Sequence, residues 1–389
     1  MTHCRRAQCT RRAFLKRGTS LVTAAGLGSL LGSRHYPLIG EAHAADNVAA
    51  TQVREYSRGG MRYRRLGNTD LFISQLSFGS HIDPAFKKGE GLSEEGQARR
   101  DRQVARAFDL GVNMIDIYEN AGQWEPVARI AKPRRDKVLV SLCRQFPDFV
   151  GKNIDQAALL YGHVDLYRIY VGDADHVSGK NLEDWDAMRK AKTAGKVRAI
   201  GISTHSERMM VSALNELEGL DYIMFPYNFI HARADYGEAL PLAIKKNVGL
   251  IAIKPLAAGS IVRLDPFVKK RSIPENANTH LYKGRNKSLL PAVVAELSKG
   301  LDQLPGESLC QAALRFVYSR PFITSAMPGM FQEHEVEDNY AAMKRHMELG
   351  SAHDDARQGV LRAARQLVEL QGSNWLPDHY RWLDKQWLA

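Results

Sequence analysis

The fold is decided by Gly111-Val112-Asn113-Met114-Ile115-Asp116-Ile117-Tyr118, a short apolar run with one carboxylate near its far end. An amphipathic segment at 93–110 precedes the run, and glycine commonly ends a helix. The order is therefore helix, glycine stop, buried strand, and an acid where the strand leaves the core. Active sites of parallel barrels lie at that end of the strands, and a buried acid needs a partner. Asp116 is thus predicted to be a site residue with a polar or charged partner.

The rest of the chain repeats this unit. Short apolar runs lie at 73–78, 113–117, 138–142, 165–170, 197–202, 222–225, 249–253 and 323–327. Helical patterns between them include 93–110, 182–194, 207–217 and 236–246. Short apolar strands separated by helices indicate parallel pairing with both sheet faces covered. Eight such units predict an α/β fold, the (β/α)8 TIM barrel. No glycine-rich dinucleotide fingerprint follows the first run, which argues against a Rossmann half.

The first 44 residues are predicted to be a twin-arginine signal peptide. Arg11 and Arg12 lie in the export pattern at 10–16, and Ala42-His43-Ala44 resembles a cleavage site. The alternative is a basic amphipathic tail. The apolar run at 20–32 is too short and too rich in glycine for a stable membrane span. We therefore predict a periplasmic protein whose partner during export is the twin-arginine translocase.

The mature chain divides into three parts. Residues 45–60 are polar and predicted to be a flexible arm, and 61–350 form the barrel, opening with a hairpin at 61–70. Within the barrel, the basic and polar insert 262–304 breaks the rhythm of strands and helices; it is either a lid over the site or a disordered linker. Helical patterns at 332–347 and 354–370 follow the last strand, and the tail 351–389 is expected to pack on the barrel.

Composition narrows the function classes. The formal net charge is +11, but residues 1–44 hold seven Lys/Arg and one acid, and the remainder has 47 basic against 42 acidic side chains. A net charge of +5 without a basic stripe does not favour a nucleic-acid partner. The four cysteines form no disulfide framework or iron–sulfur motif, and the histidines have no metal spacing. We expect no metal site.

A series of motifs resembles the aldo/keto reductase family. The matching segments, in order, are Tyr63-Arg64-Arg65-Leu66-Gly67-Asn68-Thr69, then 111–116, 135–138 and 165–167, then Gly195-Lys196-Val197-Arg198-Ala199-Ile200-Gly201-Ile202-Ser203, then 227–228, 254–259, 327–329 and 337–339. The resemblance covers about residues 61–339. It implies NAD(P)H-dependent reduction of carbonyls, in which a tyrosine donates the proton. A lysine held by an aspartate lowers the pKa of that tyrosine, and a histidine orients the carbonyl.

The chain departs from this pattern at three of the four catalytic positions. Asp116 matches the family aspartate. The family tyrosine, lysine and histidine fall at Ala121, Cys143 and Tyr170. A rewired site is our hypothesis: Tyr170 places a hydroxyl at the substrate oxygen, Arg144 pairs with Asp116, and Tyr118 is a second phenol nearby. The alternative is that Tyr118 and Tyr170 are packed aromatics and that Arg144 faces solvent.

The residues that the resemblance assigns to the cofactor depart less from the family pattern than the catalytic residues do. The resemblance implies that Ser203 and Asn228 hold the carboxamide and that Tyr227 stacks on the nicotinamide, with a core tyrosine as the alternative. The strand end at Lys254 to Leu256 suits the pyrophosphate, and the turn after Gly329 offers backbone N–H groups to phosphate. Asp338 and Asn339 match the adenine contacts. The cofactor is NAD or NADP, and Glu335 favours NAD because a carboxylate repels a 2′-phosphate.

Two functions remain open from the sequence. The first is an exported oxidoreductase acting on a small-molecule carbonyl or alcohol through a modified proton donor. The second is a catalytically inactive member that binds a nucleotide or a redox partner. Another barrel chemistry, such as a lyase or a hydrolase, is disfavoured because the necessary metal and carboxylate sets are missing.

Overall fold

A computed structural model describes residues 54–349 apart from 81, 89–90, 118–120, 145–149, 173–175, 178, 231–237, 260, 263–264, 266–293, 296 and 302. The leader 1–44, the tail 351–389, Tyr118 and most of the insert 262–304 therefore lie outside the described residues.

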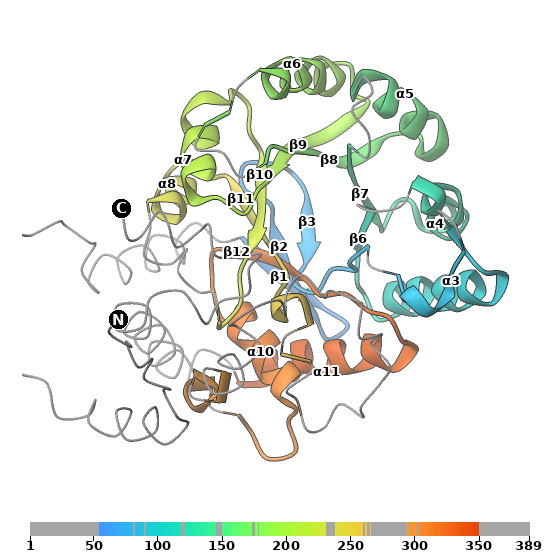
Figure 1. Cartoon of the computed structure of the whole chain (residues 1–389), viewed down its shortest axis with the longest axis vertical. Coiled ribbons are helices and arrows are strands. Elements are labelled where there is room, and N and C mark those ends of the chain that lie inside the picture. Colours follow the sequence, from blue (N-terminus) through green and yellow to red (C-terminus); the bar gives the residue numbers. More distant parts are fainter. Residues whose placement is uncertain are drawn as a thin grey trace, which may run out of the picture. The chain divides into compact units, whose positions relative to one another are not determined.

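The centre of the structure is a seven-stranded parallel sheet whose strands run in chain order from one edge to the other (Figure 1). Its strands are β6 (Met114–Ile117), β7 (Leu139–Cys143), β8 (Val164–Tyr170), β9 (Val197–Ser203), β10 (Tyr222–Pro226), β11 (Gly249–Ile253) and β12 (Ile323–Met327). Nearly every residue of these strands is buried, as expected for parallel strands covered on both faces. Seven of the eight predicted apolar runs are confirmed as strands of this sheet.

The eighth predicted run, 73–78, is divided between two sheets. Its start belongs to β3 (Phe72–Ser74), which pairs with an antiparallel hairpin instead. Its end joins the two edges of the parallel sheet, because Leu76 bridges Ala326 of β12 and Phe78 bridges Ile115 of β6. The N–H of Phe78 donates to the carbonyl of Met114 at 2.9 Å. The sheet is therefore curled and barrel-like, with residues 76–78 between its first and last strands.

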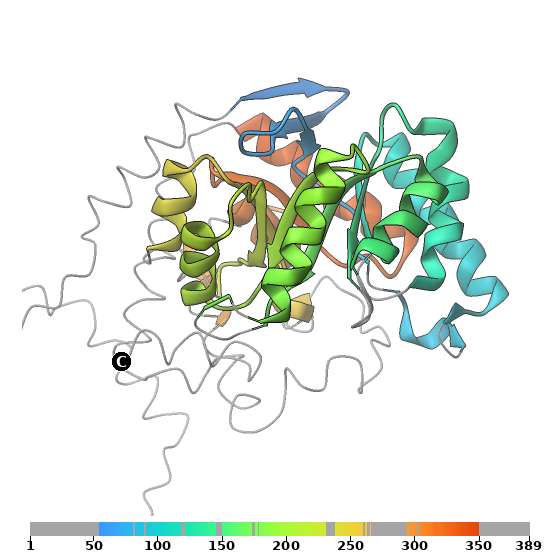
Figure 2. The same ribbon diagram turned by 90° about the horizontal axis from the view of Figure 1, so that it is seen from above.

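Helices lie on the outside of this sheet (Figures 1 and 2). They are α3 (Glu94–Asp109), α4 (Trp124–Ala131), α5 (Val150–Tyr161), α6 (Lys180–Thr193), α7 (Glu207–Glu216), α8 (Ala239–Lys245), α10 (Leu309–Tyr318) and α11 (Glu333–Leu349). Short 3-10 helices are η2 (Pro84–Phe86), η3 (Ala121–Gln123), η4 (Lys132–Arg134), η6 (Ala257–Gly259) and η9 (Lys299–Leu301). None of the helices in the described part combines the length and the apolar character needed to cross a bilayer.

The helix that precedes Asp116 begins and ends as its sequence predicts. The hydroxyl of Ser93 accepts a hydrogen bond from the N–H of Gly96 at the start of α3. Gly111, with φ +91°, turns the chain into β6, and its carbonyl accepts from the Tyr63 hydroxyl at 2.8 Å. A side chain at Gly111 would be strained and would meet that hydroxyl at 2.9 Å. This turn fixes where β6, and therefore Asp116, enters the sheet.

The flexible arm predicted for 45–60 is wrong over its last residues. Residues 55–58 form β1 (Glu55–Arg58), which pairs antiparallel with β2 (Met61–Arg65). Tyr56 stacks on Tyr63 with 4.9 Å between ring centroids, and the Arg64 side chain donates to Glu55 at 2.8 Å. An exposed edge strand shows no apolar alternation, so the polar sequence gave no signal for it. Strands β1 and β2, blue in Figure 2, lie across one end of the parallel sheet. A separate antiparallel ribbon is formed by β4 (Lys87–Lys88) and β5 (Gly91–Leu92).

The side chains inside the curled sheet form two layers, an apolar layer and, nearer the carboxyl ends of the strands, a polar layer that contains Asp116, Ser141 and Arg168. The apolar layer is a cluster of buried side chains from nearly every strand: Leu66, Leu71, Ile73, Met114, Leu139, Leu166, Ala199, Tyr222, Met224, Ile251 and Met327. Tyr222 fills this space only because its neighbour on β9, Gly201, has no side chain. A larger apolar cluster lies between the outer face of the sheet and the helices.

We predict that Gly201→Ala destabilises the protein by about 1–3 kcal/mol, because the added methyl group would lie 2.6 Å from two ring atoms and the carbonyl of fully buried Tyr222. Urea unfolding measures the loss. Gly151→Ala in α5 is the matched control, because no atom lies within 4 Å of its added carbon. Equal unfolding midpoints for the two variants would contradict the packing described for Tyr222.

Candidate active site

The partner of Asp116 is Arg168, which reaches it from β8 across β7. Both side chains are 3% exposed. The Arg168 guanidinium donates to both carboxylate oxygens, with Nη2 2.9 Å from Oδ2 and Nη1 in contact with Oδ1. The Ser141 hydroxyl donates to Oδ1 at 2.7 Å. This bidentate arrangement gives the buried carboxylate both a counter-charge and hydrogen bonds.

Burial and charge act on Arg168 in opposite directions. Burial lowers the pKa of its guanidinium, but the negative charge of Asp116 outweighs that effect and raises the pKa above its usual range. Arg168 therefore stays charged at every accessible pH. A guanidinium in this state holds Asp116 in place but gives up no proton to a substrate.

The expected pair of Arg144 with Asp116 is wrong. Arg144 forms an ion pair with Asp184 of α6, and its backbone N–H donates to the carbonyl of Arg168 at 3.1 Å. The reason is the two-residue period of a strand. Cys143 and Arg168 are aligned partners on β7 and β8, so Arg144 falls one position beyond the inward-facing set.

The position of the family lysine holds a neutral thiol. Cys143 ends β7 and is fully buried. Burial raises the pKa of this thiol to about 11, although the charge of Arg168 acts against the rise. Cys143 therefore carries no charge at neutral pH and supplies no counter-charge to Asp116. The cation that neutralises Asp116 comes from Arg168 of β8.

The carboxyl ends of β8, β9 and β11 bring Tyr170, Ser203, His205 and Lys254 to the same end of the sheet. Tyr170 and Ser203 are aligned partners on β8 and β9. The ring of Tyr170 contacts the His205 imidazole with 5.7 Å between centroids. The Lys254 Nζ lies 2.8 Å from His205 Nε2. Sequence reasoning missed His205 because it asked only about metal spacing, although the residue follows the end of β9 by two positions.

The hydroxyl of Ser203 is the clearest opening for a ligand. Ser203 is 5% exposed, and its Oγ has no hydrogen-bond partner among the described residues. An unpaired buried hydroxyl costs free energy, and such groups in native structures call for an explanation. A ligand amide that reached this strand end would satisfy it.

Two neighbouring residues take structural roles in this conformation. Asn228 is fully buried; its amide nitrogen donates to the carbonyl of Lys254 at 3.0 Å, and its amide oxygen accepts from the N–H of Ile230 at 3.1 Å. Tyr227 has no exposed surface and stacks on Phe316 of α10 with 5.9 Å between centroids. A ring without accessible surface has no face for a nicotinamide, so the expected stacking gives way to the alternative of a core tyrosine.

After the end of β12, the side chain of Glu335 occupies the backbone N–H groups that the sequence analysis assigned to a phosphate. Its Oε2 accepts from the backbone N–H groups of Phe331 and Gln332 at 2.6 and 3.0 Å. These are N–H groups at the start of α11, where a phosphate would otherwise bind. Gly329, just before them, is partly exposed.

The remaining expected cofactor residues have separate positions. Asp338 and Asn339 both lie on α11, the first exposed and the second buried. Leu256 is partly buried, and its carbonyl accepts from the N–H of Gly259 at 3.1 Å. Ala121, at the family tyrosine position, begins η3. No group of three or more His, Cys, Asp or Glu side chains in the described ranges is placed to hold a metal ion.

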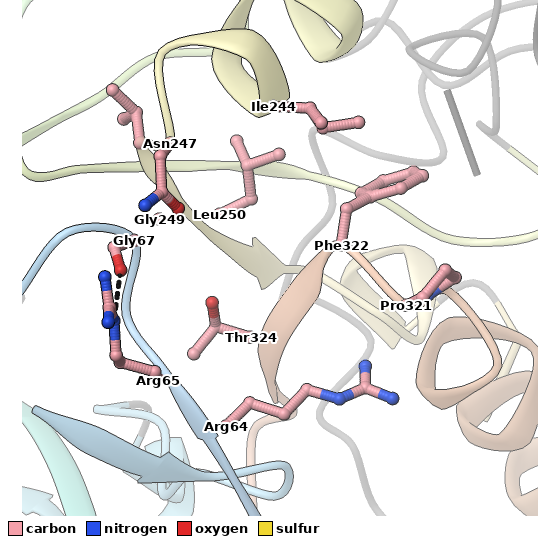
Figure 3. A pocket seen from close by; sticks show the side chains of 11 residues that line it. Arg64, Arg65, Gly67, Ile244, Asn247, Gly249, Leu250, Pro321, Phe322 and Thr324 are labelled. Atoms are coloured by element: carbon pink, nitrogen blue, oxygen red, sulfur yellow. Dashed lines mark hydrogen bonds between the residues drawn. The ribbon is translucent and has the colours of Figure 1, made fainter. Parts of the chain in front are cut away.

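A small cavity of about 50 Å³ lies at the opposite end of the strands (Figure 3). It is lined by Arg64, Arg65 and Gly67 of the N-terminal hairpin and by the first residues of β11 and β12, including Gly249 and Thr324. The Arg65 side chain donates to the carbonyl of Gly67 across its edge. Parallel barrels carry stabilising contacts rather than chemistry at this end. The cavity is therefore no part of the candidate active site.

Comparison with known proteins agrees with this layout. The model of the aldo/keto reductase family matches residues 85–350. L-galactose dehydrogenase of Arabidopsis thaliana is 26% identical over 309 residues, covering 74% of this chain and 89% of that protein. L-glyceraldehyde 3-phosphate reductase of Escherichia coli (strain K12) is 25% identical over 319 residues, covering 73% and 88%. The holo form of aldo-keto reductase AKR11C1 from Bacillus halodurans shares the fold, with a TM-score of 0.60, 18% identity, and coverage of 82% and 99%.

We predict that Arg168→Met lowers the free energy of unfolding by about 3–5 kcal/mol, because it leaves the buried Asp116 carboxylate without a counter-charge. Arg102→Met is the matched control, since Arg102 forms an exposed ion pair with Glu333. Urea titrations give both values. A loss for Arg168→Met no larger than that of the control would show that the buried pair does not hold the sheet interior together.

Proposed function

Because this chain belongs to the aldo/keto reductase family, we propose that it is a nicotinamide dinucleotide-dependent oxidoreductase that interconverts small carbonyl compounds and alcohols through a non-standard catalytic site. We take the curled sheet as the (β/α)8 barrel of that family, with residues 76–78 as its eighth strand. The observation that carries the proposal is the Ser203 hydroxyl, which is buried at the carboxyl end of β9 beside Tyr170 and has no hydrogen-bond partner within the described ranges.

The residues present fit the nicotinamide half of the cofactor. When bound, a reduced nicotinamide supplies a hydride to the carbonyl carbon. Ser203 would hold the carboxamide, because its Oγ has no hydrogen-bond partner among the residues that the structure describes and because the residue is aligned with Tyr170 at the strand end. The backbone from Lys254 to Leu256 would hold the pyrophosphate, while the Lys254 side chain stays on His205. The turn after Gly329 would border the nucleotide, but the N–H groups of Phe331 and Gln332 in it are occupied by Glu335. Asp338 and Asn339 would contact the adenine.

The proton side of the reaction differs from the family pattern. Asp116 is locked by Arg168 and Ser141, and Cys143 is neutral, so no cation lies at the lysine position to acidify a phenol. Tyr170 is partly exposed at the end of β8 and would place its hydroxyl at the substrate oxygen. The ion pair of Asp116 with Arg168 would lie beneath the substrate, inside the sheet. The ion pair of Arg144 with Asp184 would hold the end of β7 against α6.

The first test measures dinucleotide binding and turnover separately. We expect the mature-length protein to bind NADH, as followed by nucleotide fluorescence, and to reduce aldehydes or quinones from a broad panel. Ser203→Ala should weaken binding by about fivefold, since one hydrogen bond contributes roughly 1 kcal/mol. Ser319→Ala, at the far end of α10, is the control. A wild-type protein that binds no dinucleotide would refute the proposal.

The alternative function is a nucleotide-binding protein without turnover. It is favoured by the three altered catalytic positions and by the fixed pairing of Asp116. The same experiment separates the two functions. Binding of NADH with no consumption of any carbonyl on the panel supports the alternative. Turnover that is reduced in Tyr170→Phe supports the oxidoreductase and gives Tyr170 a role in it.

We further propose that the protein prefers NAD over NADP, because the Glu335 carboxylate occupies the N–H groups that would accept a 2′-phosphate. We expect Glu335→Ala to raise the affinity for NADPH relative to NADH by about tenfold or more, since it frees two donors and removes a negative charge. Glu337→Ala, on the same helix and paired with Arg106 at the surface, is the control. An unchanged ratio of the two dissociation constants in Glu335→Ala would contradict this role.

Export through the twin-arginine translocase, and hence a periplasmic location, is also proposed on the pattern around Arg11 and Arg12. Cell fractionation of the native chain and of Arg11→Lys/Arg12→Lys tests it. The native chain should appear in the periplasm and the variant in the cytoplasm. Equal distribution of both would refute the route.

A further inference from the structure

The pair formed by Lys254 and His205 is a second centre of proton chemistry at the carboxyl end of the strands. The Lys254 Nζ and His205 Nε2 lie 2.8 Å apart, within hydrogen-bond distance. Two fully protonated groups would repel each other at this separation, so the hydrogen bond requires a lone pair on one of the two nitrogens. The pair therefore contains one hydrogen bond, in which either the Lys254 ammonium donates to His205 Nε2 or a protonated His205 donates to a neutral Lys254 amine.

Backbone contacts hold both partners of this pair. Lys254 has φ +54°, a left-handed conformation that is uncommon for a residue with a side chain, and its carbonyl accepts from the Asn228 amide. His205 lies between Thr204, whose hydroxyl donates to the carbonyl of Gly172 at 2.8 Å, and Ser206, which caps α7. Strained non-glycine residues that are held by their surroundings gather at functional sites.

Arg168 and Arg144 are unsuited to proton transfer. Arg168 is paired with Asp116 and Arg144 with Asp184, and a guanidinium does not release its proton near neutral pH. Lysine and histidine exchange protons readily, and His205 and Lys254 are both partly exposed, which allows them to regain a proton from water. His205 also contacts Tyr170, which is aligned with Ser203 on the neighbouring strand. The pair thus lies beside the place where the unpartnered hydroxyl would hold a nicotinamide.

We propose that the His205–Lys254 pair is the general acid of the carbonyl reduction, in place of the missing tyrosine; this rests on the proposed oxidoreductase function. As the carbonyl carbon gains a hydride, the π electron pair of the C=O bond moves to oxygen. The oxygen then bonds to the proton given up by the pair, and the electrons of the broken N–H bond stay on nitrogen. The product is an alcohol, and the pair takes its next proton from water. Tyr170 packs its ring on the imidazole, and its hydroxyl would orient the substrate oxygen without giving up the proton.

The proposal is tested with His205→Gln and Lys254→Met in the mature-length protein. Glutamine keeps a hydrogen-bonding group beside Lys254 but holds no transferable proton. We expect aldehyde turnover to fall by about 100-fold or more in His205→Gln, the range of general acid catalysis, while its dissociation constant for NADH changes less than threefold. His163→Gln is the matched control, because His163 lies beside the start of β8, near Asp165, at the other end of the strand. Its turnover should match that of the wild type.

A second readout does not depend on activity. In protein with ¹⁵N-labelled histidines and no nucleotide, the His205 resonances are assigned by their loss in His205→Gln. Lys254→Met should shift them, because it removes the hydrogen-bond partner of His205. Unshifted His205 resonances, or turnover within threefold of wild type in His205→Gln, would overturn the proposal alone. A wild-type protein that binds no dinucleotide, or that reduces no carbonyl, would instead overturn the proposed function together with the donor role.

Discussion

The buried ion pair of Asp116 with Arg168 is the interaction on which the rest of the structure depends. It connects β6 to β8 over the Ser141 hydroxyl of β7, inside a sheet whose next layer is apolar. Each charge alone would be costly in such surroundings, so the two positions are coupled: neither tolerates loss of the other. The pair also fixes register, because Arg168 is aligned with Cys143, one inward-facing position beyond Ser141.

This pairing determines what chemistry remains available. A family aspartate that holds a lysine can acidify a tyrosine, whereas an aspartate clamped by a bidentate arginine cannot. The polar layer inside the sheet is therefore structural, and groups that exchange protons are found farther out. There, Lys254 and His205 share a hydrogen bond near Tyr170 and the buried Ser203 hydroxyl. On the nucleotide side, Glu335 uses a carboxylate of the chain itself where a phosphate would bind.

Much of the fold could be predicted from the sequence because its strands are continuous apolar runs. The helix predicted at 93–110 is α3 (Glu94–Asp109), and the pattern at 332–347 is α11 (Glu333–Leu349). The failures have local causes. Residues 73–78 read as one strand, but Asn113 bonds to the backbone of Ser74 and directs the first half into the hairpin sheet. The edge strand β1 is exposed on every residue and left no periodic signal.

The site was harder to predict because its key contacts join residues that are distant in the chain. Arg144 was chosen for its closeness to Cys143 in sequence, yet Arg168 was the better candidate on strand geometry. It lies two positions before Tyr170 on β8, so both face the same side. Tyr227 depends on a ring from α10 for its packing, and no local pattern predicts that contact.

The central claim is that Asp116 requires one buried cation, which Arg168 supplies from β8. Placing that cation on β7 instead tests the claim most directly, by comparing unfolding free energies of wild type, Arg168→Leu, and Cys143→Lys/Arg168→Leu. We expect the double variant to recover most of the loss seen in Arg168→Leu, because lysine at 143 would face Asp116 from inside the sheet. A double variant as unstable as Arg168→Leu alone would contradict the account.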